Sequence, residues 1–195
     1  MTDKQIDRVR KKIEKYKKAL KADKKYWGGY YHDGAGIRYA IPNLFIKIID
    51  YKGGLKYLNW FDKNFPDDIG DPIFLFEWTF ILFKCGKLKE AEEKAHRTFF
   101  SNTYLWDIFL GKKLLNLDIT ESSSWEFQSI GNYFTYTSSD TEFIEFTSWI
   151  QGVLNNRRFL ETVNEFVQIE QQLKTEPVGQ IRSELVAKYS KIKYG

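Results

Sequence analysis

The segment from Ile37 to Tyr104 reads as one two-helix unit written twice in succession, at an offset of 37 residues. Aligned on this offset, residues 51–54 match residues 88–91, and the bulky Phe45 matches Leu82. Repeats of this length are typical of stacked helical arrays, because a single hairpin cannot bury its apolar face alone. The repeat therefore predicts an all-α chain that builds its core by stacking hairpins.

Start and stop signals divide the repeat into helices. Asp71-Pro72 is a capping side chain followed by proline at the first helical position, and Gly86 fits the left-handed residue that ends a helix. Pro42 lies inside the first expected helix and removes a backbone donor there. The predicted helices of the two hairpins cover about 36–50, 52–64, 71–86 and 87–100.

The first 25 residues form a strongly basic segment, with 11 Lys or Arg against four acids, whereas the whole chain has a net charge of only +4. Ile6, Val9, Ile13, Tyr16 and Leu20 recur at alternating steps of three and four residues. This spacing predicts an amphipathic helix over 1–25, capped by Thr2 or Asp3, whose apolar stripe packs on the array.

A glycine-rich joint at 26–36 follows the basic helix. Glycine allows close backbone approaches, and such loops often carry ligand sites. The joint has no phosphate-loop ending and no preceding strand, so a nucleotide fingerprint is absent. Its candidate ligand-binding residues are Tyr31, His32, Asp33 and Arg38, which include the types needed for proton transfer or anion binding.

The region 105–175 carries weaker copies of the hairpin pattern. We expect a helix over 103–117, another from the capping-box spacing of Ser123 to Glu126 as far as Tyr136, and two more in which 146–153 and 159–166 match the earlier repeat. A last helix at about 178–191 fits a polar capping helix. In total we predict about ten helices in a single domain, 1–195.

Part of the second hairpin resembles a tetratricopeptide repeat. Gly86, Leu88, Ala91 and Ala95 match the glycine, bulky and alanine places of that pattern, and Trp78 and Leu82 match two bulky places. The first hairpin fits through Tyr51, Gly54, Leu58 and Pro66 but departs at Pro42, and the offset of 37 exceeds the family's usual 34. The resemblance implies a right-handed superhelix of antiparallel hairpins.

The resemblance also implies a concave groove that binds a peptide or helix of a protein partner. An aromatic groove with a basic edge suits an apolar or amphipathic segment. Covering of the same phenylalanines by another part of the chain is the open alternative, and Phe80→Asp separates the two. The partner-binding positions carried over from the family are Tyr39, Asn43, Lys47, Phe76, Phe80, Phe83 and Lys84.

Two other functions stay open at this point. The glycine joint could bind a small ligand or support hydrolysis through His32 and Asp33, and the basic helix could bind nucleic acid, although it lacks a recognised reading motif. No catalytic motif is found, so we expect no enzyme, no cofactor and no metal. One cysteine and no apolar run of membrane-spanning length favour a cytoplasmic protein, with self-association left open.

Overall fold

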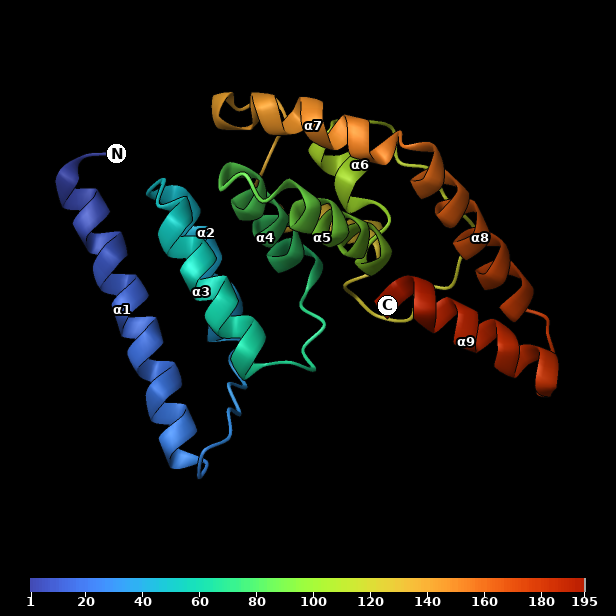
Figure 1. The fold of residues 1–195 in the computed structure, drawn as a ribbon, viewed down its shortest axis with the longest axis horizontal. Helices are drawn as coiled ribbons and strands as arrows, with labels where there is room; N and C mark the ends of the chain where they lie inside the picture. The colour runs from blue at the N-terminus through green and yellow to red at the C-terminus, as the bar shows by residue number, and fades with distance from the viewer. Residues whose placement is uncertain (195) are drawn as a thin grey trace. The chain divides into compact units, whose positions relative to one another are not determined.

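The computed structural model describes residues 1–194, and this part of the chain is helical without any strand. It contains nine α-helices and three short 3-10 helices, about 68% helix in all (Figure 1). The all-α prediction is confirmed, and the helix number is close to the ten expected. The helices group into two compact units, Met1–Ala91 and Glu92–Gly195, which we describe separately. The single-domain assignment stays a prediction.

The first unit begins with the basic helix α1, Asp3–Tyr26. Thr2 and Gln5 form a reciprocal capping box at its start, as the sequence predicted for Thr2. Ile13 and Leu20 are its buried side chains, and α1 packs against α2 and the 3-10 helix η1 (Figure 1). The predicted packing of the apolar stripe on the array is confirmed.

The expected helix at 36–50 is split. A 3-10 turn, η1 at Ile37–Tyr39, precedes the short helix α2 at Ala40–Lys47. Pro42 therefore lies in the first turn of α2. Backbone N–H groups have no intrahelical acceptor there, so the missing N–H of proline removes no helix hydrogen bond. Asp50 then accepts from the backbone N–H of Gly53 and caps α3, Tyr51–Asn64.

The predicted boundaries of the next two helices are confirmed. Asp71 accepts from the N–H groups of the first turn of α4, Pro72–Lys84, and Gly86 has a φ of 71° at the end of that helix. Helix α5 follows at Leu88–Ser101. Ala91 is fully buried, as the repeat pattern requires, whereas Leu88 is 49% exposed and does not fill a core place.

Helices α2, α3 and α4 pack against one another around an aromatic core. Phe61 of α3 lies at its centre, with its ring centroid 4.7 Å from that of Phe74 and 5.7 Å from that of Trp78, both on α4. Ten residues of α4 are buried, so this helix is apolar on nearly every face because it is enclosed.

The expectation for 103–136 is largely wrong. Helix α6 covers only Leu105–Phe109, and Gly111, with a φ of 64°, follows its end. The predicted second helix is replaced by a turn and a 3-10 helix, η2 at Gln128–Asn132. The carboxylate of Glu126 does accept from the N–H groups of Ser122 and Ser123, but this cap closes a turn and starts no helix.

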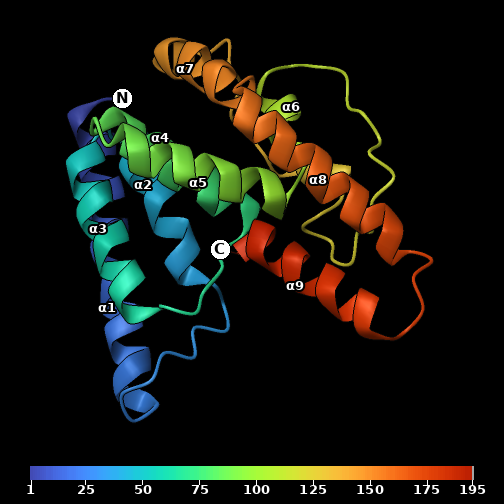
Figure 2. The same ribbon diagram turned by 45° about the vertical axis from the view of Figure 1, so that its right-hand side comes forward.

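The second unit ends with three helices that the sequence did predict. The 3-10 turn η3, Thr141–Phe143, leads into α7, Ile144–Leu154, followed by α8, Arg157–Leu173, and α9, Gln180–Tyr194. Helices α8 and α9 lie side by side as a hairpin (Figure 2). One hydrophobic cluster of this unit joins α5 and α8, and its buried residues are Phe100, Phe159 and Phe166.

Candidate functional site

The aromatic groove carried over from the repeat family is not on the surface. Phe76 and Phe80 are both 0% exposed, and the ring of Phe80 meets that of Tyr51 edge-on at 5.6 Å. These two expected contact residues are therefore core residues, and the prediction that they bind a partner is corrected. The repeat pattern places these residues on an open groove, but in this chain the other helices cover them. An exposed apolar patch of this size is costly to leave in water.

The other expected groove residues do not form one surface. Lys47 is exposed, while Asn43 and Phe83 are half-buried. The ammonium group of Lys84 lies over the rings of Tyr51 and Phe80, 5.7 Å from each centroid. Tyr39 is also engaged inside the fold, because its hydroxyl donates to Asp68 at 2.6 Å.

The glycine-rich joint is held by carboxylates that accept from its own backbone. Asp23 at the end of α1 accepts from the N–H groups of His32 and Asp33. Asp33, which is buried, accepts from the N–H groups of Ile37 and Arg38 and so starts η1. The joint is thus an ordered turn whose polar groups stabilise the chain reversal between α1 and η1.

Arg38 links this joint to the turn between α3 and α4. Its guanidinium is 3.0 Å from the Asp33 carboxylate and 2.8 Å from that of Asp68, and all three side chains are largely buried. Burial alone lowers the pKa of Arg38, but the hydrogen bonds to Asp68 and Asp33 outweigh it and raise the pKa, so the charge is fixed. We call Asp33, Arg38, Tyr39 and Asp68 the Arg38 network.

The proposed catalytic use of His32 and Asp33 finds no geometric support. The carboxylate of Asp33 faces Arg38 and the start of η1, while His32 is exposed and stacks on Trp27 with 4.9 Å between ring centroids. Tyr31 packs on Phe65, and burial raises its pKa. Of the four candidate residues of the joint, Asp33 and Arg38 belong to the Arg38 network. His32 is an exposed ring, and Tyr31 is a packed ring.

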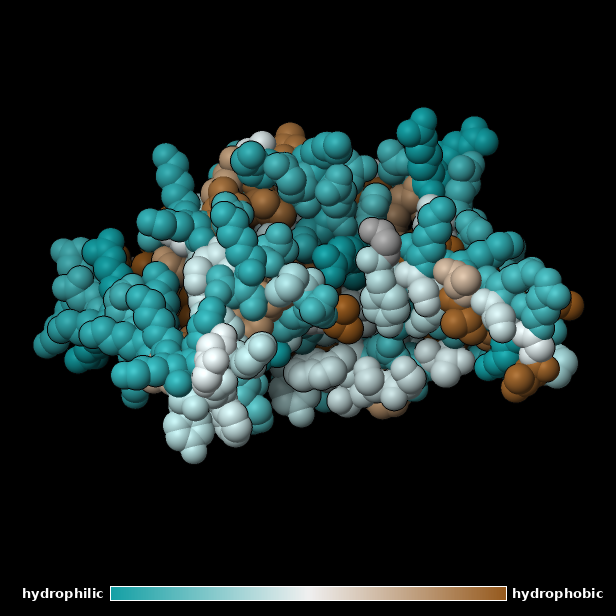
Figure 3. Space-filling view, turned by 60° about the horizontal axis from the view of Figure 1, so that its bottom comes forward, coloured by the Kyte–Doolittle hydropathy of each residue, from teal (hydrophilic) through white to brown (hydrophobic). Residues whose placement is uncertain are grey.

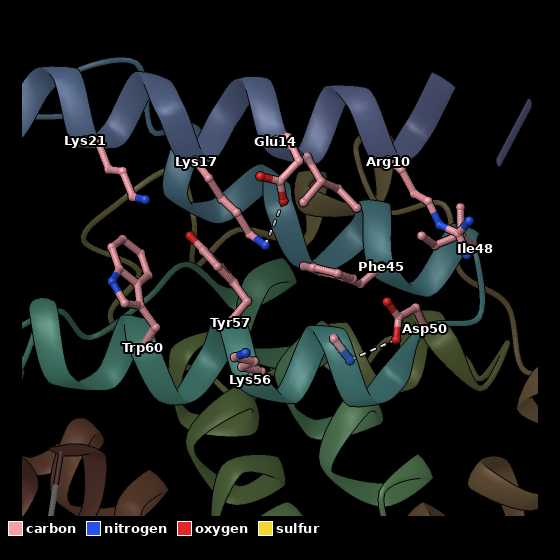
Figure 4. Close-up of a pocket in the computed structure, with 12 residues that line it drawn as sticks. Arg10, Glu14, Lys17, Lys21, Phe45, Ile48, Asp50, Lys56, Tyr57 and Trp60 are labelled. Carbon is pink, nitrogen blue, oxygen red and sulfur yellow. Dashed lines mark hydrogen bonds and ion pairs between the residues drawn. The ribbon is translucent and has the colours of Figure 1, made fainter. Parts of the chain in front are cut away.

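A cavity of about 600 Å³ lies between α1 and α3, with Phe45 of α2 between them (Figure 4). Arg10, Lys17 and Lys21 extend from α1 toward α3, and Tyr57 and Trp60 extend from α3 toward α1. We call this cavity the α1–α3 groove. Its lining residues are Arg10, Ile13, Glu14, Lys17, Lys21, Phe45, Ile48, Asp50, Gly53, Lys56, Tyr57 and Trp60.

The α1–α3 groove combines an apolar floor with a positive rim. Glu14 is paired with Lys17 at 3.2 Å, and Asp50 is used as the cap of α3, so both acids of the lining are already engaged. Lys21 and Lys56 have no ion-pair partner among the described residues. The space between α1 and α3 can therefore accept an anionic group beside aromatic rings.

A glycine pair at the start of α3 allows Phe45 to lie deep in the groove. A Cβ at Gly53 would stand 2.4 Å from the Asp50 carboxylate and 2.8 Å from the Phe45 ring. A Cβ at Gly54 would stand 2.9 Å from Ile81 of α4. Larger residues here would push α3 away from α2 and α4, so the glycines set the depth of the groove floor.

Sequence reasoning missed this groove because its residues come from three segments. The stripe of α1 contained Ile13, and the repeat contained Phe45, but nothing in the sequence placed Trp60 opposite α1. The stripe in the sequence carried no signal of this gap. In the structure only two of its five residues, Ile13 and Leu20, are buried, so α1 does not close fully over its neighbours.

His96 is the remaining isolated titratable candidate, and its environment predicts a pH effect. Its ring stacks on Phe159 at 4.4 Å, and its buried Nε2 has no hydrogen-bond partner among the described residues. Burial lowers its pKa, with Glu92 and Glu93 acting in the opposite direction.

A lowered folded-state pKa means that the unfolded chain binds this proton first as the pH falls. We expect the contribution of His96 to be fully present above about pH 6.5 and to decline below it, by less than about 1 kcal/mol because the ring is partly exposed. Urea unfolding of wild type and His96→Leu at pH 7.5 and 5.5 would measure it. An equal loss of stability in both proteins would contradict it.

Comparison with protein-family models, curated proteins and solved structures found no match to this chain. Within residues 1–194, no helix has both the length and the apolar character needed to cross a membrane. In the same residues, no group of three or more His, Cys, Asp or Glu is placed to hold a metal ion. The described residues form an all-helical protein in which neighbouring helices pack on one another.

Proposed function

We propose that this protein recognises an acidic, amphipathic peptide segment of a partner protein in the α1–α3 groove. The supporting observation is the combination of Lys21 and Lys56, which have no ion-pair partner in the described chain, with the rings of Phe45 and Trp60. A groove between two helices suits an amphipathic helix, whose apolar face contacts the floor while its acidic flank meets the cations.

The proposal also includes a fold family and a cellular location. Gly86, Ala91 and Ala95 support a right-handed hairpin array resembling tetratricopeptide repeats, and arrays of that kind commonly present binding surfaces. The single cysteine favours the cytoplasm as the place of action. Both assignments are part of this proposal.

A pair of synthetic helical peptides tests the groove. The first carries leucine at positions i, i+3, i+4 and i+7 with glutamate elsewhere, and the second has lysine in place of every glutamate. We expect the acidic peptide to bind and Lys21→Glu/Lys56→Glu to weaken binding by at least about tenfold, because two attractive charges become repulsive. Fluorescence anisotropy of labelled peptide measures both affinities.

The matched control is Lys113→Glu/Lys188→Glu, which makes the same charge change at exposed positions of the second unit. Its affinity for the acidic peptide should stay within about twofold of wild type, since neither lysine lines the groove and exposed charges are screened at physiological salt. Equal binding of the two peptides, or equal weakening by both double variants, would show that the groove does not select acidic segments.

A further inference from the structure

The end of α1 carries a group of exposed aromatic side chains that the groove does not use. Tyr26 is 81% exposed, Trp27 48% and Tyr30 80%, and we call these three residues the aromatic tip. Gly28 and Gly29 between them have φ values of 64° and 105°, and no atom lies within 4 Å of where their Cβ would stand. The tip therefore projects from the end of α1 (Figure 1).

The aromatic tip is ordered. The N–H of Gly29 donates to the carbonyl of Lys24 at 2.8 Å and continues the last turn of α1. Trp27 stacks on His32, while Tyr26 meets the Trp27 ring edge-on at 5.3 Å. The rings of Tyr26 and Trp27 are thus in contact, and the N–H of Tyr30 donates to the carbonyl of Trp27 at 3.4 Å, with the glycines supplying the positive φ values that the turn requires.

The surroundings of the tip are basic. Lys18 and Lys25 of the last turns of α1 are exposed, and neither has an ion-pair partner in the described chain. The acid nearest in sequence, Asp23, is occupied by the N–H groups of His32 and Asp33. In Figure 3 the left-hand side of the view is mostly hydrophilic, and paler residues lie along the lower edge.

We propose that the aromatic tip and the lysines behind it bind the surface of an anionic phospholipid membrane. Tyrosine and tryptophan favour the headgroup level, because each has an apolar ring and a polar atom that stays hydrated. Each lysine near an anionic surface adds electrostatic attraction to it. This function is independent of peptide binding in the α1–α3 groove.

The geometry favours lipid over single-stranded nucleic acid. Bases stack on open ring faces, and His32 already occupies one face of Trp27 while Tyr26 packs on the same ring. Exposed aromatic rings at one turn are suited to shallow insertion among headgroups instead, and that mode needs no free ring face.

Cosedimentation with vesicles tests the proposal. The probes are phosphatidylcholine vesicles with and without phosphatidylserine, at low and at high NaCl concentration. We expect binding only to the vesicles that contain phosphatidylserine, with loss at high salt because the lysines are screened. Tyr26→Ser/Trp27→Ser/Tyr30→Ser should weaken binding by at least about tenfold, and Lys18→Glu/Lys25→Glu should do the same independently.

Two control variants separate the tip from general exposure and charge. Trp125→Ser/Tyr133→Ser removes exposed aromatics of the second unit, and Lys113→Glu/Lys188→Glu reverses charges there. Both should bind vesicles as wild type does. The proposal is overturned by equal binding to neutral vesicles, by wild-type binding of both tip variants, or by tighter binding to single-stranded DNA than to the anionic vesicles. Circular dichroism of the lysine variant checks that its α1 stays folded.

Discussion

Phe80→Asp is expected to unfold the first unit rather than to block partner binding. Phe80 is 0% exposed within α4, between the helices of the aromatic core, and packs on Tyr51. The substitution removes the burial of a whole ring and places a carboxylate where water does not reach, a combined cost above about 5 kcal/mol. Such a loss equals the total stability of many domains. Far-UV circular dichroism and a urea titration measure it.

Phe127→Asp is the matched control, since it makes the same chemical change at a side chain that is 39% exposed. Its urea midpoint should fall far less. A Phe80→Asp protein with the helical content and urea midpoint of wild type would mean that this side of α4 is open to solvent, and the aromatic groove first expected there would then return as the binding surface.

Arg38→Met is expected to be the most damaging change outside the apolar core. It retains most of the side-chain volume but leaves the carboxylates of Asp33 and Asp68 largely buried without their cation. Removing one partner of a buried ion pair costs about 3–5 kcal/mol, because the remaining charge stays desolvated. The free energy of unfolding from urea titration is the quantity to compare.

The control for this change is Arg157→Met, because Arg157 forms an ion pair with Glu161 on the exposed face of α8, where its own side chain is 91% exposed. An exposed pair contributes about 0–1 kcal/mol. Similar losses in the two variants would show that the Arg38 network is hydrated and contributes no more than a surface pair.

The sequence predicted those parts of the fold that depend on signals close together in the chain. The caps at Thr2 and Asp71 and the helix end at Gly86 all act within one helical turn, so each can be recognised without knowing the tertiary structure. The repeat offset likewise located α3, α4 and α5, because a hairpin is a local unit.

The rest depends on contacts between segments distant in sequence. The capping spacing at Ser123 predicted a helix, yet Glu126 forms an ion pair with Lys193 at 2.7 Å, 67 residues away, and the chain there forms a turn. The α1–α3 groove likewise needs α1 to lie beside α2 while leaving a gap to α3. The periodicity of one helix carries no information about that gap.

The Arg38 network also bears on how this chain reaches its fold. Arg38 and Asp68 lie 30 residues apart, and Asp23 contacts residues only 9 and 10 positions later. The entropy cost of closing such loops rises only slowly with loop length, so the longer loop to Asp68 costs little more than the shorter ones. In the first unit α1 packs on α2, α2 on α3 and α3 on α4, and contacts between sequence neighbours of this kind favour rapid folding.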